Sequence, residues 1–495
     1  SDPLCENSQV QWGEKSAYAW EAVKRTQMLY ETSVGLLQGD LRRGKNPTLT
    51  IFNTLNWKRS EMLTVYIDFE VIPRKQFFEI TDFQGHSLKV QPIRYRREGC
   101  YYAIFAEDIP PMGYKTFEIV FKQPSTDTGT ITINNASIEN HFYKLQLNPD
   151  KGTIQSLYDK ELNCELVDSS SPWELGAFIY EKLGNRDQLA QYRLDDYNRT
   201  GLSECRIIDS SNGPIYQRIL LQGKSPGTDE AFGVNLEIKL YHDTKRIELE
   251  YAIKRLPETD PSGIYVAFPF QLPEGKLAFD VQGGTVISGK NQLEGTSTDW
   301  NTVQNFVSVQ NNQAQIIIGS SLIPLYQLGD INLGKFQYQK QYERPHVYSW
   351  VMNNYWNTNF KASQEGEFRW SYHLTSSVDP SNNLATKFGW SSRIPLYARV
   401  MPTGTENHKP TEYSAFHFEK DNFLMTSCTP SKEEGYILLN IREIDGKRTN
   451  LRILNEDGQT IPFTIVNAIE EKLENETSEH IFEGYQNKFI KIKRF

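Results

Sequence analysis

The sequence predicts a mainly β protein in which one long N-terminal helix precedes three β-sandwich domains. Apolar and polar residues alternate over many short stretches, as antiparallel strands with one covered face require. Proline and glycine separate these stretches, where turns are expected. Only one segment, near the N-terminus, has apolar residues at the spacing of a helix face.

Composition excludes several classes of protein. The 495 residues are 38% hydrophobic and 12% aromatic, with a net charge of -9, which excludes both disorder and a basic nucleic-acid surface. No apolar run has the roughly 18 residues of a membrane span, and no signal peptide is evident. We therefore expect a soluble chain, cytoplasmic or periplasmic, without a nucleic-acid partner. The five cysteines form no C-x-x-C pair, so they predict ordinary thiols with at most one disulfide.

The helical domain is predicted over residues 1–46, with the helix itself over 16–41. Its apolar face, spaced by three and four residues, comprises Trp20, Val23, Gln27, Tyr30, Val34, Leu37 and Leu41. Gly44 and Pro47 end the helix. Such a stripe needs a cover, so the helix either docks on the β domains or belongs to a bundle whose other helices lie upstream. The chain begins with Ser1 instead of Met, which suggests a processed chain or part of a longer one.

Three sandwiches are predicted after the helix. Their expected bounds are 47–124 for a small sandwich, 125–380 for a large one and 381–495 for a C-terminal one. The clearest strands are predicted at 49–52, 62–67, 101–105, 114–120, 142–147, 234–240, 246–253, 435–441 and 489–492. A polar stretch at 123–129 is typical of a linker, and Asp445-Gly446 is typical of a hairpin turn.

No common catalytic signature is present. The sequence has no phosphate-binding P-loop, no His-Glu-x-x-His pair and no Gly-x-Ser-x-Gly elbow. Its eight histidines do not pair at metal-ligand spacing. A glycosidase needs two facing carboxylates, and the 62 acidic residues offer no way to select such a pair from sequence.

The informative stretches combine amides with large aromatic rings. Residues 351–360 hold four amides and three rings, a mixture that suits sugars, because rings cover C–H faces while amides bind hydroxyls. The alternative is a loop whose amides cap local backbone groups. A second stretch lies at 293–304. A third, at 176–181, is equally typical of a buried strand.

Six motifs in order along the chain point to one family. They are IFNTLNWKRS at 51–60, NHFY at 140–143, GTIQSLYDK at 152–160, the segment 295–304, PLYQLGD at 324–330 and the segment 353–360. Together they resemble the C-terminal half of glycoside hydrolase family 38, the α-mannosidases, and in particular its bacterial members. Each motif is weak alone, and their common order carries the resemblance.

The resemblance implies a specific role. The family cleaves α-mannosides with retention, using an aspartate nucleophile and a zinc ion in an N-terminal catalytic domain to which this sequence has no counterpart. The helical segment would be the end of the family's three-helix bundle, and the large sandwich a galactose-mutarotase-like supersandwich. We expect no catalytic residue, metal ligand or cofactor in this chain, and no activity from it alone. Mannose-containing glycans would be the parent enzyme's substrates, with an intramolecular catalytic domain as partner.

The same resemblance nominates residues that would face the sugar. They are Tyr180, Asp299, Trp300, Asn354 and Trp356. Tyr180 matches the aromatic residue of the family's Gly-Ala-Tyr-like strand, although Phe178 departs from that pattern and leaves the register open by a residue or two. The alternative is that all five only shape the core and an interface.

Two other functions stay open. Large sandwiches also resemble those of aldose epimerases and polysaccharide lyases, which work with His/Glu or Asn/His/Tyr/Arg sets inside the sandwich. A cleft with convergent histidine and carboxylate groups would favour such an enzyme. A carbohydrate-binding or scaffolding chain would bind sugar without turnover, and an exposed apolar face around Trp20 would favour a missing domain.

Overall fold

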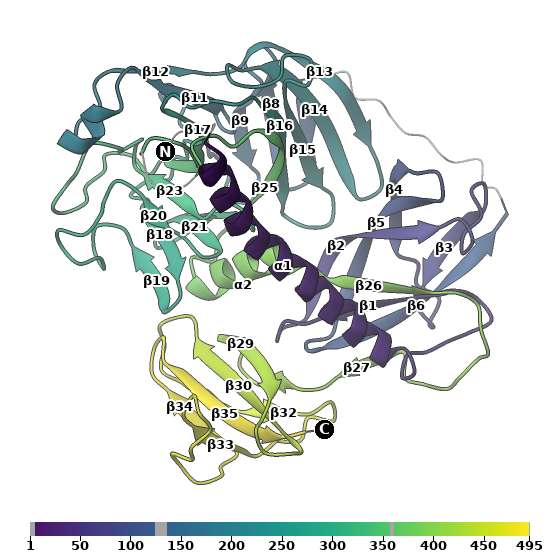
Figure 1. The fold of residues 1–495 in the computed structure, drawn as a ribbon. Coiled ribbons are helices and arrows are strands. Elements are labelled where there is room, and N and C mark those ends of the chain that lie inside the picture. Colours follow the sequence, from purple (N-terminus) through teal and green to yellow (C-terminus); the bar gives the residue numbers. More distant parts are fainter. Residues whose placement is uncertain (1–4, 124–135, 357–360, 495) are drawn as a thin grey trace.

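A computed structural model describes residues 5–123, 136–356 and 361–494. The fold is mainly β, as predicted, with three sandwiches and a long helix that runs diagonally across one face (Figure 1). The predicted linker lies outside the described residues except for Gln123, as do residues 357–360 of the aromatic and amide-rich stretch.

The long helix, α1 (Glu6–Leu37), begins ten residues before its predicted start and ends four residues early. Only its last turns are packed: Val34 is buried with Phe52 and with Leu41, which lies beyond the helix, and the Tyr30 ring lies 4.7 Å from that of Tyr397. Trp20 is 74% exposed. The predicted apolar stripe is therefore covered at its C-terminal end and exposed over most of its length.

The small sandwich consists of two antiparallel sheets. One has the order β26-β1-β6-β27, with β3 also on β6, and the other has the order β2-β5-β4. The bounds are β1 (Thr48–Asn53), β2 (Arg59–Asp68), β3 (Phe77–Thr81), β4 (Lys89–Tyr95), β5 (Gly99–Ile109), β6 (Gly113–Lys122), β26 (Tyr397–Met401) and β27 (Glu412–Ser414). β26 and β27 follow the predicted boundary at 380, yet they pair with β1 and β6. The small sandwich is thus built from two chain segments separated by the whole large sandwich.

The large sandwich contains a nine-stranded, a six-stranded and a four-stranded sheet. The nine-stranded order is β13 (Ser203–Asn212), β14 (Tyr216–Lys224), β15 (Val234–Tyr241), β16 (Ile247–Arg255), β25 (Gly366–Ser377), β22 (Gln315–Gly319), β21 (Phe306–Gln310), β18 (Lys276–Val281) and β19 (Gly284–Ile287). The six-stranded order is β12 (Tyr197–Thr200), β11 (Phe178–Leu183), β17 (Ser262–Phe268), β24 (Val347–Asn353), β23 (Leu325–Leu328) and β20 (Asn301–Thr302). The four-stranded order is β10 (Cys164–Glu165), β9 (Thr153–Asp159), β8 (Tyr143–Asn148) and β7 (Ser137–Glu139).

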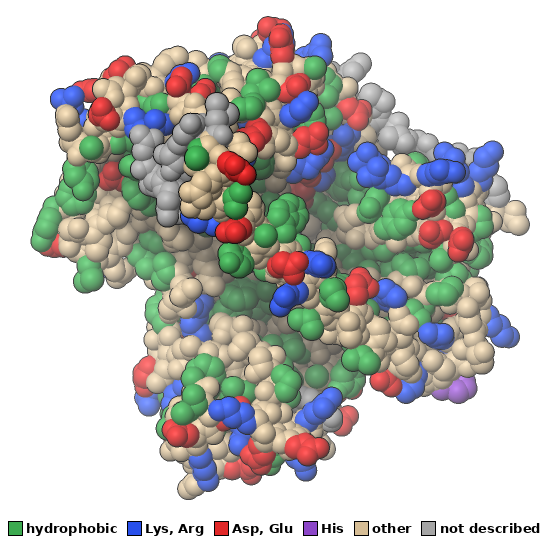
Figure 2. All heavy atoms as spheres, in the orientation of Figure 1, with side chains coloured by type: hydrophobic (Ala, Val, Ile, Leu, Met, Phe, Trp, Pro, Cys, Tyr) green, Lys and Arg blue, Asp and Glu red, His purple; other side chains and the backbone are tan. Residues whose placement is uncertain are grey.

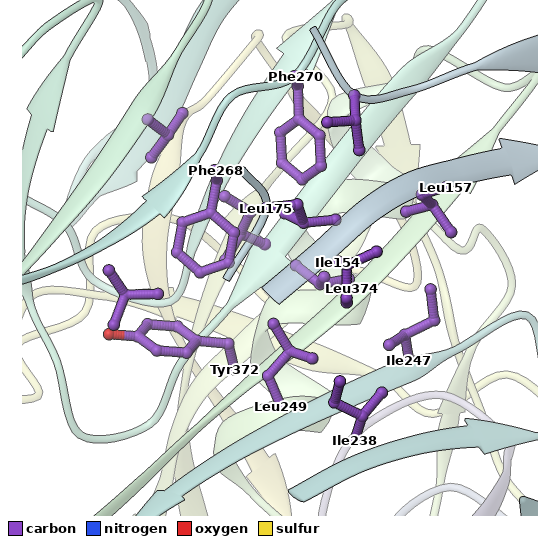
Figure 3. Packing of buried hydrophobic residues seen from close by; sticks show 14 of the residues in the cluster. Ile154, Leu157, Leu175, Ile238, Ile247, Leu249, Phe268, Phe270, Tyr372 and Leu374 are labelled. Atoms are coloured by element: carbon purple, nitrogen blue, oxygen red, sulfur yellow. The ribbon is translucent and has the colours of Figure 1, made fainter. Parts of the chain in front are cut away.

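The main core fills the space between these sheets. Figure 3 shows Leu249 and Tyr372 of the nine-stranded sheet and Phe268 of the six-stranded sheet side by side, with Ile154 of β9 nearby. Period-two alternation on each strand supplies these residues to one face. The opposite face of the six-stranded sheet is also apolar, and a separate cluster covers it.

The C-terminal sandwich follows a short helix. This helix, α2 (Asn382–Arg393), begins after Ser381, whose hydroxyl accepts a hydrogen bond from the Leu384 N–H at 3.2 Å. The main sheet has the order β29 (Phe423–Pro430), β30 (Tyr436–Glu443), β35 (Asn487–Lys493) and β33 (Phe463–Val466). Two pairs complete the domain: β28 (His417–Phe418) with β32 (Ile453–Leu454), and β31 (Thr449–Leu451) with β34 (His480–Phe482).

All five cysteines are free, so the disulfide allowed by the sequence is absent.

Candidate functional site

An aromatic cluster covers the outer face of the six-stranded sheet. We define it as Tyr265, Trp300, Trp350, Tyr355 and Trp356. The Tyr265 and Trp350 rings are parallel at 5.9 Å, and the Trp300 and Trp356 rings lie 5.6 Å apart, each 5.6–6.0 Å from Trp350. Trp350 is buried, whereas Trp356 is 42% exposed. The cluster therefore presents a partly exposed tryptophan pair on a rigid, buried aromatic base.

A wholly buried carboxylate lies beneath this base. Glu181 of β11 forms an ion pair with Arg199 of β12 and accepts hydrogen bonds from the hydroxyl groups of Tyr355 and Tyr265. Burial, together with the nearby Glu181 charge, raises the pKa of Tyr265 and of Tyr355 well above the usual value, so both phenols remain hydrogen-bond donors. The network fixes the aromatic base through charge-assisted hydrogen bonds.

Hydrogen bonds between side chains and nearby backbone groups fix the turn that carries Trp356. Asn354 accepts from Ser262 N–H at 2.7 Å and donates from its side-chain amide to the carbonyl oxygens of Glu258 and Ala362 at 3.0 and 3.1 Å. Arg186 donates to the Tyr355 carbonyl oxygen at 3.0 Å. Asn354 thus uses its amide on local backbone groups, the alternative raised by the sequence, and positions Trp356 instead of reaching outward itself.

Asp299 and Trp300 precede the short strand β20. Asp299 is buried, accepts a hydrogen bond from the Gly334 N–H at 3.1 Å, and has its pKa raised by burial. The neighbouring Thr298 hydroxyl donates to the Gln337 carbonyl oxygen at 3.2 Å and accepts from the Gln337 N–H at 3.1 Å. These bonds tie the segment before β20 to the long connection between β23 and β24.

That connection lines a polar pocket of about 580 Å³. Its lining includes one histidine, His346, and five charged residues, Asp330, Lys335, Lys340, Glu343 and Arg344. The His346 Nε2 lies 2.9 Å from the Asp168 carboxylate, which also pairs with Arg344 at 3.3 Å. Burial lowers the pKa of His346 although Asp168 opposes this, so the imidazole is neutral near pH 7.

The structure brings some of the predicted site residues together and separates others. The Trp300 and Trp356 rings are in contact, and Asp299 is hydrogen-bonded to Gly334 of the connection between β23 and β24. Tyr180 lies on the other side of β11, in the core between the sheets, where it is 4% exposed and lies under the Arg255 guanidinium at 5.3 Å. A side chain in that position contributes to packing.

Sequence reasoning missed the residues that complete this region. Glu181 follows Tyr180 and therefore faces the aromatic cluster, a consequence of strand alternation that the sequence contains. The partners Arg199 and Tyr355 lie on other strands and turns and carry no local signal.

Among the residues that the structure describes, no group of three or more His, Cys, Asp or Glu side chains could hold a metal ion. Within the same residues no helix has the length and apolarity to cross a membrane.

Comparisons with known proteins agree with the motifs. Residues 138–336 match the model of the glycosyl hydrolases family 38 C-terminal domain. No curated protein matches the chain by sequence. An α-mannosidase from Enterococcus faecalis V583 is similar in structure, with a TM-score of 0.71 and 13% identity, over 94% of this chain and 59% of that chain. A family 38 protein from Enterococcus faecalis aligns with a TM-score of 0.70 and 13% identity, over 94% of this chain and 61% of that one.

A weaker similarity, to a galactose mutarotase-like protein from Lactobacillus casei, has a TM-score of 0.30 and covers 50% of this chain. The chain spans about three fifths of the length of the two Enterococcus structures. At 13% identity these alignments show a shared fold. The match over residues 138–336 shows that this part of the chain is similar to the family 38 C-terminal domain, in agreement with the ordered motifs.

Proposed function

We propose that this chain is the C-terminal β region of a retaining, zinc-dependent α-mannosidase, which supports a catalytic domain and partly lines its sugar site. One observation carries the proposal: residues 138–336 match the family 38 C-terminal domain, and 94% of the chain shares the fold of an α-mannosidase that is considerably longer. The fold similarity thus extends over nearly the whole chain and includes the segment that matches the family.

The described residues do not fit a zinc site, since they contain no group of three metal-ligating side chains. In the proposal zinc is therefore bound by residues of the catalytic domain, and no role in zinc binding is assigned to this chain. Its own contribution is to hold a surface beside the sugar.

The exposed face of α1 supports a missing neighbour. Trp20 and Val23 lie on the predicted apolar stripe and are both exposed in the structure. A cavity of about 760 Å³ lies between α1, β2 and the segment 391–400, and Figure 2 shows hydrophobic side chains gathered around the hollows of this face. Large apolar side chains left exposed along one helix are typical of an interface. In the proposal, the catalytic domain covers it.

The tryptophan pair supplies the sugar contact in this proposal. The partly exposed Trp356 ring can stack against the C–H face of a pyranose, and Trp300 closes one side. Asn354 and Arg186 fix the turn, so little conformational entropy is lost when sugar binds. Asp299 is the residue before Trp300, and its carboxylate accepts a hydrogen bond from the Gly334 N–H. In this proposal the bond holds the backbone that carries Trp300.

The test is complementation. We expect this chain to hydrolyse no aryl α-mannoside with added zinc, and to restore hydrolysis when mixed with a separately produced family 38 catalytic domain. Trp20→Asp on α1 should prevent restoration, whereas Tyr95→Asp, at an exposed residue of β4, should not. Turnover by this chain alone would overturn the proposal. Sugar binding without restoration would favour the carbohydrate-binding or scaffolding alternative.

A second candidate function is a self-contained sugar epimerase or lyase. The observation that favours it is the His346–Asp168 pair beside the polar pocket, a neutral imidazole hydrogen-bonded to a carboxylate. Such a pair can act as a general base. Polarimetry of a freshly dissolved aldose would detect mutarotation, and His346→Gln should abolish it. A rate equal to the buffer rate would exclude the epimerase.

A further inference from the structure

Lys340 is a buried lysine without a partner. It lines the polar pocket, is only 7% exposed, and among the described residues makes neither an ion pair nor a side-chain hydrogen bond. The neighbouring Lys335, by contrast, pairs with Asp330 at 2.8 Å. The Lys340 side chain is largely removed from water, and no carboxylate of the described residues lies within ion-pairing distance of its ammonium, so part of the lost hydration is not replaced. A lysine kept in this state therefore points to a ligand.

The backbone around Lys340 is fixed. Gly289 adopts a φ of +75°, and a Cβ there would lie 2.4 Å from the Lys340 carbonyl oxygen, so the two segments are in close contact. The Gln341 N–H donates to the Gln337 side-chain oxygen at 2.9 Å, and the Leu277 N–H donates to the Tyr342 hydroxyl at 3.0 Å. The pocket wall is thus a built structure anchored to β18.

The acidic groups near Lys340 each have another bonding partner and none forms an ion pair with it. Asp299 accepts from Gly334, Asp330 pairs with Lys335, and Asp168 is shared by Arg344 and His346. Glu343 lines the pocket too, but it is exposed to solvent, where screening weakens its field. Among the described lining residues, Lys340 is therefore a buried cation that forms no ion pair, although Asp299 and Asp330 lie near enough to favour its charged form.

We propose that this pocket binds an oxyanion group of a small ligand, a phosphate, sulfate or carboxylate, through the ammonium of Lys340. The side-chain amide of Gln341 lines the same pocket and offers further N–H donors. A volume of about 580 Å³ accommodates such a group together with a sugar-sized body. This inference goes beyond the proposed mannosidase role and does not depend on it.

The protonation of Lys340 makes the proposal testable. Burial lowers the pKa of its ammonium to about 8, while Asp299 and Asp330 raise it and Lys335 lowers it further. A bound anion favours the charged form, so binding takes up a proton above this pH. Binding should therefore be strong below pH 8 and weaken by about tenfold between pH 7 and pH 9.

The experiment is calorimetric titration of the whole chain with sulfate, which does not titrate in this range, at low chloride concentration. Wild-type protein should bind sulfate with the stated pH dependence. Lys340→Met should remove binding, and Lys340→Arg should retain it and lose the pH dependence, because arginine stays charged. Lys335→Met is the matched control, since its lysine lines the same pocket but is already paired, and it should bind within about threefold of wild type.

Titrations with phosphate and acetate then distinguish the anion classes. Equal binding by wild type and Lys340→Met, absence of sulfate binding by the wild type, or unchanged affinity from pH 7 to pH 9 would each overturn the proposal. The wild-type pH profile keeps the test valid even where a variant fails to fold. None of these titrations involves a mannoside, so the result is independent of the proposed hydrolase function.

Discussion

His373 should destabilise the large sandwich when the solution becomes acidic. It lies on β25 opposite Glu248 of β16, with its Nδ1 3.7 Å from the Glu248 carboxylate, and it is 8% exposed. Burial lowers its pKa from 6.5 to about 3; Arg246 and Lys239 act in the same direction, and Glu248 opposes them. Burial is the largest influence on the Glu248 pKa and would raise it, but Lys239, His373 and Arg246 together outweigh burial and hold the pKa well below the usual range, so Glu248 stays charged.

The size of the effect follows from the two pKa values of His373. The unfolded chain, with a pKa of 6.5, binds the proton more readily than the folded chain, with a pKa of about 3. Stability is therefore fully present above pH 6.5 and is lost as the pH falls from 6.5 toward 3. At pH 4 the expected loss is about 3 kcal/mol relative to pH 8.

The assay compares wild type with His373→Gln in urea denaturation at several pH values, using tryptophan fluorescence. The variant removes the titrating group, so effects of all other acids cancel in the difference between the two proteins. Whatever the difference at pH 8, it should shift by about 3 kcal/mol in favour of the variant at pH 4. A difference that stays constant with pH would show that His373 titrates normally and would refute the reasoning.

Three further substitutions test other features. Arg199→Met leaves the Glu181 charge buried and unpaired, so the free energy of unfolding should fall by about 3–5 kcal/mol in the same assay; a loss below about 1 kcal/mol would contradict the buried pair. Asn354→Ala removes several hydrogen bonds at one turn and should cost about 2 kcal/mol, with weaker saccharide binding in calorimetry; unchanged binding would argue against the role of this turn. Gly113→Ala would place a Cβ 1.9 Å from the Tyr413 carbonyl oxygen, so β27 should detach; limited proteolysis there should accelerate, and an unchanged rate would count against the contact.

Strands with clean alternation could be predicted closely, whereas helix bounds could not. The predicted strand at 234–240 is β15 (Val234–Tyr241), because alternation marks both of its ends. The start of α1 was predicted too late because residues 6–15 are mostly polar and show no apolar stripe, although the helix runs through them. α2 was not predicted because Gly389 lies inside it, and glycine disfavours a helix on local propensity alone. A Cβ at this position would lie 3.0 Å from Phe306, so the helix is stabilised by close packing against β21, which the local sequence does not reveal.

The candidate site, too, could be predicted from the sequence only in part. Trp300 and Trp356, whose rings lie 5.6 Å apart, could be nominated together because both stand in stretches rich in aromatic and amide residues that carry the family resemblance. The Glu181 network could not, since Tyr355 and Glu181 are 174 residues apart and meet only through the strand order β11-β17-β24. Lys340 carries no signal in sequence, because its significance is the absence of a partner in three dimensions.

The pairing of β26 and β27 with β1 and β6 determines when the small sandwich can be completed during synthesis. β1 leaves the ribosome early, yet the strand that covers its second edge follows nearly 350 residues later, at Tyr397–Met401. Until then β1, buried on all six residues in the finished fold, has an open edge that can pair with another chain. Separating the gene at residue 380 into independent expression units would make this transient hazard permanent, because the small sandwich needs strands from both sides of that position.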